Sequence, residues 1–271
     1  MEYAPQHAAL ILSEVDKIRN NNESESMKVR RLWVTLAFVH ANSIANILRN
    51  TIGTSVYSGP FKGMKLAQSA MTGAYGPTLL GTYEHELHPI FEQAIAKKYK
   101  QVLNIGCSFG YYTVGLALRM PDTIVHSFDI DPEARKACTE MVALNGVQDR
   151  VKIEGEFRGE DFAKYPAEGT LVLMDIEGFE TQLLDPSKYP ALKKMDILVE
   201  LHDVFDSEIS KKVLDRFTES HDIQLITHTN MMFDFKQITG PVRYIDPFDD
   251  FLINWENRDG PTPWAMMTPK K

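Results

Sequence analysis

Residues 102–113 read VLNIGCSFGYYT, and residues 124–132 read IVHSFDIDP. In the first stretch a short apolar run ends in a glycine-containing turn, which predicts a strand over 101–105 and a helix from Tyr111 to Arg119. The second stretch predicts a strand over 123–128 and a helix from Pro132 to Asn145, with Gly146 as its stop signal. Two such units in succession are typical of a parallel sheet covered by helices.

The same alternation continues toward the C-terminus. Further strands are predicted at 151–153, 170–176, 197–201, 223–227 and 264–268, and further helices at 181–194 and 207–220. Because crossovers between parallel strands are right-handed, helices cover both faces and ligands bind at the carboxyl ends of the strands. The sequence therefore predicts an α/β fold: a Rossmann-like, mostly parallel twisted sheet of about seven strands with helices on both faces.

The part of the chain before this pattern has a different character. Residues 1–50 carry apolar residues at helical spacing and are expected to form an N-terminal helical extension, which serves as structural padding or as a homodimer contact. Residues 51–81 are rich in Gly, Pro, Ser and Thr. They are expected to form a segment that connects the helical extension to the next domain, with a short hairpin near 61–64. A helix is predicted from Thr82 to about Lys98, so that residues 82–271 form the ligand-binding domain.

Bulk composition excludes several classes of protein. The 271 residues carry a formal net charge of -8, which disfavours non-specific binding to nucleic acid. The N-terminus lacks the apolar core of a signal peptide, and no stretch approaches the roughly 20 apolar residues of a membrane span. Two cysteines are too few for a disulfide framework. We therefore expect a cytoplasmic protein whose partner is a small molecule rather than nucleic acid or a membrane.

The glycine-containing turn is the strongest local signal for a ligand. Gly106 and Gly110 lack side chains where the backbone would pass close to a ligand, and the following helix offers free N–H groups. Cys107 and Ser108 lie between these glycines, and all four residues are predicted to contact a cofactor. The spacing differs from the G-x-G-x-x-G of dinucleotide enzymes and favours a nucleoside–methionine ligand. An ordinary tight turn is the alternative.

Polar residues at the ends of the next two strands extend this prediction. Asp129 ends the second strand, where a carboxylate can accept hydrogen bonds from both ribose hydroxyls. Asp131, followed by a proline, is expected to be the N-cap of the next helix. Gly155 and Glu156 follow the third strand and are candidates for the adenine side of the site, with a solvated turn as the alternative.

Acidic residues and a histidine follow the fourth and fifth strands. Asp175 and Glu177 could orient an acceptor, take its proton or hold a divalent cation, although no metal site is predicted here. His202 is the candidate general base because its ordinary pKa is near neutrality, and a buried structural histidine is the alternative. The segment His85–His88 lacks the spacing of a zinc motif and is expected to be helix surface.

These residues resemble the FkbM-like branch of class I S-adenosylmethionine (SAM)-dependent methyltransferases over residues 60–205. The stretch MDIEGFE at 174–180 resembles that branch's strand-four motif, and GPFKGM at 59–64 and LGTYE at 80–84 resemble segments upstream of it. Asn104 and Ser108 depart from the general SAM motif, which usually has an acidic residue and a glycine there. The resemblance implies SAM as cofactor and O-methylation of a small-molecule or sugar-like acceptor.

Two rival functions remain open at this point. A Rossmann oxidoreductase is disfavoured because the third glycine of its motif is missing. A SAM-fold protein that binds the cofactor without turnover, as a regulatory subunit, is compatible with Asn104. The acidic residues after the fourth strand favour an enzyme, because cofactor binding alone does not need them.

Overall fold

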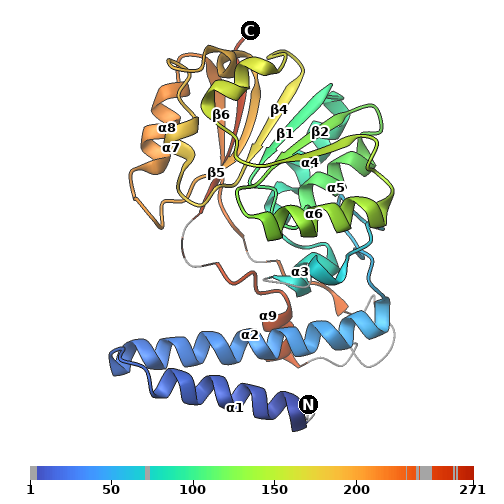
Figure 1. The fold of residues 1–271 in the computed structure, drawn as a ribbon, viewed down its shortest axis with the longest axis vertical. Coiled ribbons are helices and arrows are strands. Elements are labelled where there is room, and N and C mark those ends of the chain that lie inside the picture. Colours follow the sequence, from blue (N-terminus) through green and yellow to red (C-terminus); the bar gives the residue numbers. More distant parts are fainter. Residues whose placement is uncertain are drawn as a thin grey trace.

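A sheet of seven strands, in the order β3-β2-β1-β4-β5-β7-β6, forms the centre of the computed structural model (Figure 1). The structure describes residues 5–70, 74–229, 231–235, 238, 246–258, 260 and 262–271. The strands are β1 Gln101–Ile105, β2 Ile124–Phe128, β3 Val151–Glu154, β4 Thr170–Met174, β5 Asp196–Glu200, β6 His221–Ile226 and β7 Trp264–Pro269. The first five in chain order are parallel, and β7 runs antiparallel to both β5 and β6. This arrangement is a Rossmann-like, mostly parallel sheet with helices, and the predicted fold class is confirmed.

The strand register brings the ends of four parallel strands to one edge of the sheet. Ile105 at the end of β1 pairs with Phe128 of β2 and with Met174 of β4. Met174 in turn pairs with Val199 of β5. The residues that directly follow these strands therefore lie side by side, although they are far apart in the sequence.

Helices cover both faces of the sheet, and each face has its own core. The helices α4 His88–Lys97, α5 Tyr111–Arg119 and α6 Pro132–Asn145 pack on one face, against side chains such as Val102 and Leu171. The helix α8 Ile209–Phe217 packs on the other face, against side chains such as Leu103 and Val172. Successive residues of β1 and β4 thus enter opposite cores, as the alternation of side chains along a strand requires. Both faces are buried, which explains why these strands are continuous apolar runs.

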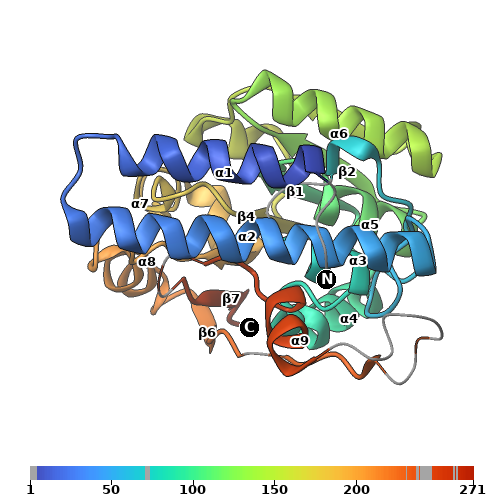
Figure 2. The ribbon, with the colours of Figure 1, turned by 90° about the horizontal axis from the view of Figure 1, so that it is seen from below.

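Two helices precede the sheet domain and lie side by side at one end of the molecule (Figures 1 and 2). They are α1 Pro5–Arg19 and α2 Glu25–Ile52. The longer helix α2 packs against α3 Tyr75–Leu80 and α9 Pro247–Ile253. The predicted helical extension is therefore present, and the domain boundaries assigned to it remain a prediction. No helix within the described ranges has the length and apolar character to cross a membrane.

Several predicted elements differ from the structure. The single helix expected over 181–194 is replaced by α7 Glu180–Leu183 and a 3-10 turn, η4 Pro190–Lys194, because Pro186 and Pro190 cannot continue a helix. The helix expected from Thr82 begins only at α4, after a second 3-10 turn, η2 His85–Leu87. A third such turn, η3 Gly159–Lys164, follows β3, and η1 Gln68–Ala70 precedes α3. The helix α9 was not predicted. The hairpin near 61–64 is confirmed as a tight turn closed by a bridge between Ser55 and Lys65.

Candidate functional site

A pocket of about 430 Å³ opens at the carboxyl ends of β1, β2 and β4. This volume lies in the range of small-molecule sites, and the position is where open α/β sheets bind ligands. Its lining residues come from the loops after β1 to β4 and from α7: Ile105, Gly106, Phe128, Asp129, Ile130, Gly155, Glu156, Phe157, Asp175, Ile176, Glu177, Phe179, Gln182 and Leu183. Six residues predicted from the sequence thus meet at one cavity, whereas Cys107, Ser108, Gly110 and His202 do not line it.

Gly106 and Gly110, in the turn after β1, must both lack a side chain, because other parts of the chain occupy the space of their Cβ atoms. Gly106 has a φ of 84°, and a Cβ built there would lie 1.6 Å from the carbonyl oxygen of Asp175. Gly110 has a φ of 93° at the start of α5, and its Cβ would lie 2.8 Å from the Cys138 sulfur of α6. The absence of side chains was attributed to a ligand, but the structure shows that the first glycine admits the chain after β4 and the second admits helix α6.

Cys107 and Ser108 do not line the pocket, and the backbone of Ser108 contacts a residue that does. The Cys107 side chain is buried, and a hydrogen bond with the thiol of Cys138 together with burial raises its pKa, so it stays protonated. The backbone N–H of Ser108 donates a 2.9 Å hydrogen bond to Oδ2 of Asp129. The turn therefore acts on the pocket by fixing the carboxylate of Asp129.

Asp129 is the carboxylate that faces the pocket at the end of β2. Its Oδ1 accepts a hydrogen bond from the backbone N–H of Asp131 at 2.9 Å, in addition to the bond from Ser108 to Oδ2. Each carboxylate oxygen has a further lone pair, so the group can still accept from a ligand. Asp131 caps helix α6 as predicted, because its side chain accepts from the N–H of Glu133 at 2.9 Å.

Apolar side chains line the pocket together with the Gly155–Glu156 turn. Phe157 is buried between Phe128 and Phe162, with ring centroids 4.8 Å apart in each pair. Ile130 lines the same pocket with 77 % of its surface exposed. Sequence analysis did not single out these residues, although an apolar residue between two aspartates at a strand end is a usable signal for a surface that stacks on a flat ring.

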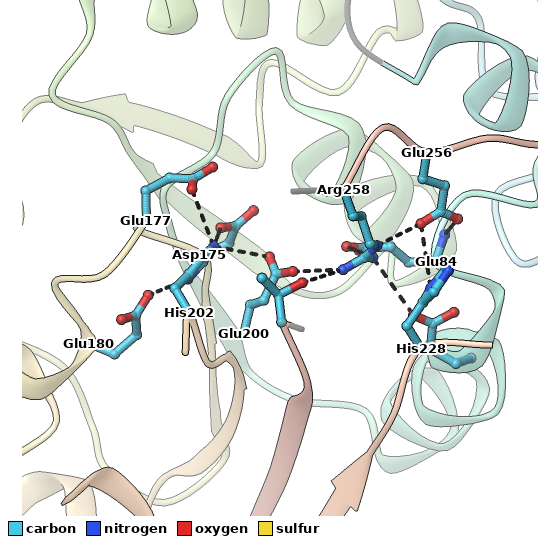
Figure 3. A network of polar contacts seen from close by, with 11 residues as sticks. Glu84, Asp175, Glu177, Glu180, Glu200, His202, His228, Glu256 and Arg258 are labelled. Atoms are coloured by element: carbon cyan, nitrogen blue, oxygen red, sulfur yellow. Dashed lines mark hydrogen bonds and ion pairs between the residues drawn. The ribbon is translucent and has the colours of Figure 1, made fainter. Parts of the chain in front are cut away.

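Asp175 and Glu177, which line the pocket, come together with His202, which does not line it (Figure 3). Nε2 of His202 lies 3.5 Å from Oδ1 of Asp175 and 3.4 Å from Oε2 of Glu177. Its Nδ1–H donates to Oε1 of Glu180 at 2.6 Å, and Glu180 is fully buried. The structure thus brings together Asp175 and His202, which follow different strands. Sequence analysis missed Glu180 as the group that orients the imidazole.

The charges around His202 set its protonation. Burial lowers the pKa of the imidazole, but the hydrogen bond with Glu180 and the charges of Glu200 and Asp175 outweigh burial and raise the pKa to about 9. Burial and the charge of Glu200 raise the pKa of Asp175 well above its ordinary value. His202 is 3 % exposed and does not line the pocket. Its predicted role as a general base remains a prediction.

A second charged group adjoins this one and shares Glu200 with it (Figure 3). Arg258 donates to Glu84 at 2.6 Å, to Glu200 at 2.8 Å and to Glu256 at 2.9 Å. Glu86 also faces this group and is almost completely buried. The prediction that 85–88 is helix surface was therefore wrong, because the carboxylate of Glu86 turns inward toward Arg258.

Asn104 stands where the SAM motif usually has an acidic residue, and its side chain has a structural role in the core. It is buried, and its side-chain amide donates to Oγ1 of Thr113 at 2.8 Å. Thr113 also hydrogen-bonds the hydroxyl of Ser127 in β2 at 2.8 Å. This side chain therefore joins β1 to α5 and does not line the pocket.

No protein-family model matches this chain, and no curated protein sequence matches it. Solved structures do resemble it. Cofactor-bound Rv0187 from MTB matches with a TM-score of 0.47 and 15 % identity, over 86 % of this chain and 88 % of that one. The O-methyltransferase TomG from Streptomyces achromogenes, in complex with SAM, gives 0.47 and 14 %, over 86 % and 99 %. An rRNA methylase from Streptococcus thermophilus gives 0.47 and 11 %, over 68 % and 96 %. Because these TM-scores are low, the function proposed below rests on the residues of the site.

Proposed function

We propose that this chain is a SAM-dependent methyltransferase that transfers a methyl group to an oxygen of a small, sugar-like acceptor. The observation that carries the proposal is a single pocket that is lined both by Asp129 after β2 and by Asp175 and Glu177 after β4. One cavity would therefore hold both the nucleoside, bound by Asp129, and the acceptor, next to Asp175 and Glu177. The strand-four motif at 174–180 further suggests the FkbM-like branch of these enzymes.

The lining residues fit SAM along its length. The carboxylate of Asp129 has free lone pairs for the ribose hydroxyls, since its present partners are backbone N–H groups. Ile130 and Phe157 offer apolar surface for the adenine beside Gly155 and Glu156. Gly106, just after β1, lines the pocket together with Asp175, and the methionine part would lie along this side.

SAM, when bound, supplies a methyl group on a positively charged sulfur, so this group needs no further activation. The carbon–sulfur bond breaks as the carbon–oxygen bond forms, and an alcohol acceptor must then lose its proton. Asp175 and Glu177 line the pocket and can accept that proton. Nε2 of His202 lies 3.5 Å from Oδ1 of Asp175, where a charged imidazole favours the ionised form of this carboxylate. The protein mainly aligns the two reactants and excludes water between them.

Titration calorimetry with the full chain tests this proposal. SAM and S-adenosylhomocysteine should each bind with one site per chain and raise the melting temperature by linkage. NADH should give no heat, because the turn after β1 lacks the third glycine of a dinucleotide site. Absence of heat and of thermal shift with both SAM and S-adenosylhomocysteine would refute the proposal, and binding of NADH alone would replace it with an oxidoreductase.

A further inference from the structure

The gap in front of Nε2 of His202 has the dimensions of a metal site. Nε2 makes no hydrogen bond to any described residue, and oxygens of Asp175, Glu177 and Glu200 lie 3.5, 3.4 and 3.6 Å away. These separations are too long for good hydrogen bonds. Two ligand atoms that are each about 2.1 Å from one ion lie about 3.0–3.4 Å apart in octahedral or tetrahedral geometry. The spacing therefore fits neighbouring ligands around a small cation.

The imidazole is oriented in the way that metal-bound histidines are. Its Nδ1–H donates to Oε1 of Glu180 at 2.6 Å, which directs Nε2 toward the gap. A carboxylate on the far nitrogen fixes the tautomer and raises the basicity of a metal ligand. Glu180 is fully buried, and its Oε2 has no hydrogen-bond partner among the described residues. This second oxygen is thus a buried polar atom without a described partner, next to the imidazole, and such atoms normally mark a missing ligand or strain.

Glu200 and Asp175 each have one carboxylate oxygen near Nε2 of His202. Glu200 is 6 % exposed, and Arg258 binds its Oε1 at 2.8 Å, so that Oε2 is the atom nearest His202. Oδ1 of Asp175 is buried and has no hydrogen-bond partner in the described part of the chain. Single donor atoms of Asp175, Glu200 and His202 all lie within 4.8 Å of one another. Buried polar atoms without partners normally mark a missing ligand or strain.

We infer that Asp175, Glu200 and His202 bind one divalent first-row transition-metal cation, of which Mn²⁺ is the representative. One nitrogen and two carboxylate oxygens suit such an ion, whereas Ca²⁺ and Mg²⁺ prefer ligand sets made only of oxygen. Asp175 also lines the pocket, so the ion would lie at its acceptor end. If the proposed function holds, the ion would polarise the acceptor oxygen and lower the pKa of its hydroxyl. Glu177 at the exposed lip would remain free to take the proton.

The test is a titration of the metal-free full chain with Mn²⁺, followed by electron paramagnetic resonance, without SAM. We expect one bound Mn²⁺ per chain and a coupling to one histidine nitrogen in the pulsed spectrum. His202→Gln should remove the nitrogen coupling, and His202→Gln and Asp175→Asn should each weaken binding by more than about tenfold. Glu180→Gln, which alters only the orienting group, should weaken it by about 10- to 100-fold.

Asp203→Asn is the matched control. Asp203 follows His202 directly, but its carboxylate binds Ser210 and not the gap. This variant should bind Mn²⁺ like the parent chain. The inference is overturned if the parent chain binds no Mn²⁺, or if its bound Mn²⁺ shows no nitrogen coupling. The second result needs no variant and is decisive even where a substitution prevents folding. Because SAM is absent from the experiment, its outcome is independent of whether SAM binds.

Discussion

Asp129 and Asp131 are two residues apart and carry different functions at the residue scale. The side chain of Asp131 accepts a hydrogen bond from a free backbone N–H in the first turn of α6. The carboxylate of Asp129 faces the pocket and accepts hydrogen bonds from two backbone N–H groups. Both assignments could be made from sequence, because a strand end followed by Asp-Pro fixes which carboxylate caps the helix. The supporting contact from Ser108 could not be predicted, since it depends on how the turn after β1 folds back onto β2.

Asp129→Ala should weaken SAM binding by about 1–3 kcal/mol, which is the range for losing hydrogen bonds to a charged group. The fold should survive, because the residue lies at a strand end. The control is Asp131→Ala, which should cost about 0.5–2 kcal/mol of stability through the lost helix cap and leave SAM affinity unchanged. Calorimetry and urea unfolding separate the two. Unchanged affinity in a folded Asp129→Ala protein would move the ribose site elsewhere.

Gly106→Ala should disrupt the turn after β1 far more than a positive φ alone would. The new Cβ would collide with the backbone of Asp175, because the built position is 1.6 Å from its carbonyl oxygen. Gly146→Ala is the control: Gly146 also has a positive φ, of 67°, but nothing lies within 4 Å of its Cβ position. The control should cost about 1–2 kcal/mol by thermal unfolding. Equal destabilisation of the two variants would show that the close approach at Gly106 is unimportant.

At the scale of elements, the strands were predictable and their partners across the sheet were not. The sequence predicted every strand of the sheet to within a few residues, and most clearly β4 and β5, which are buried along their whole length and are therefore apolar runs. Helix α9 was missed because it is short and its packing partner α2 is remote in sequence. The charged group around Arg258 was missed for the same reason: it joins Glu84, Glu200 and Glu256 from separate segments. The spacing of residues within one segment of the sequence does not predict contacts between segments that are far apart in the chain.

Arg258→Met should destabilise the protein by about 3–5 kcal/mol, because it leaves buried glutamates without their cation. The result should be visible as a lower urea midpoint at pH 7. Arg158→Met is the matched control, since Arg158 pairs with Glu156 but is 70 % exposed. Exposed pairs contribute at most about 1 kcal/mol, so this variant should unfold like the parent. Similar midpoints for both variants would contradict the role assigned to Arg258.

At the scale of the whole molecule, the N-terminal helices present an apolar surface to solvent. Trp33 and Leu36 on α2 are exposed, and Phe248 on α9 is exposed beside them. They line a groove of about 570 Å³ between α1, α2 and α9. Large exposed apolar patches are uncommon on monomers and often mark an interface. The homodimer expected from the sequence remains a prediction that this surface supports.

Light scattering at several protein concentrations tests the predicted homodimer. The parent chain should have the mass of a dimer, and Trp33→Asp should shift it toward the monomer because a charge would be buried at the contact. Leu144→Asp, on an exposed position of α6, is the control and should leave the mass unchanged. A monomeric parent chain at every concentration would show that α1 and α2 do not form a dimer contact.

A crystal structure grown with S-adenosylhomocysteine tests most directly whether SAM binds in the pocket lined by Asp129 and Asp175. The ribose hydroxyls should bind the carboxylate of Asp129, the adenine should lie against Ile130 and Phe157, and the sulfur should face Asp175. Electron density for the ligand at another place, or with its sulfur directed away from Asp175, would contradict this account.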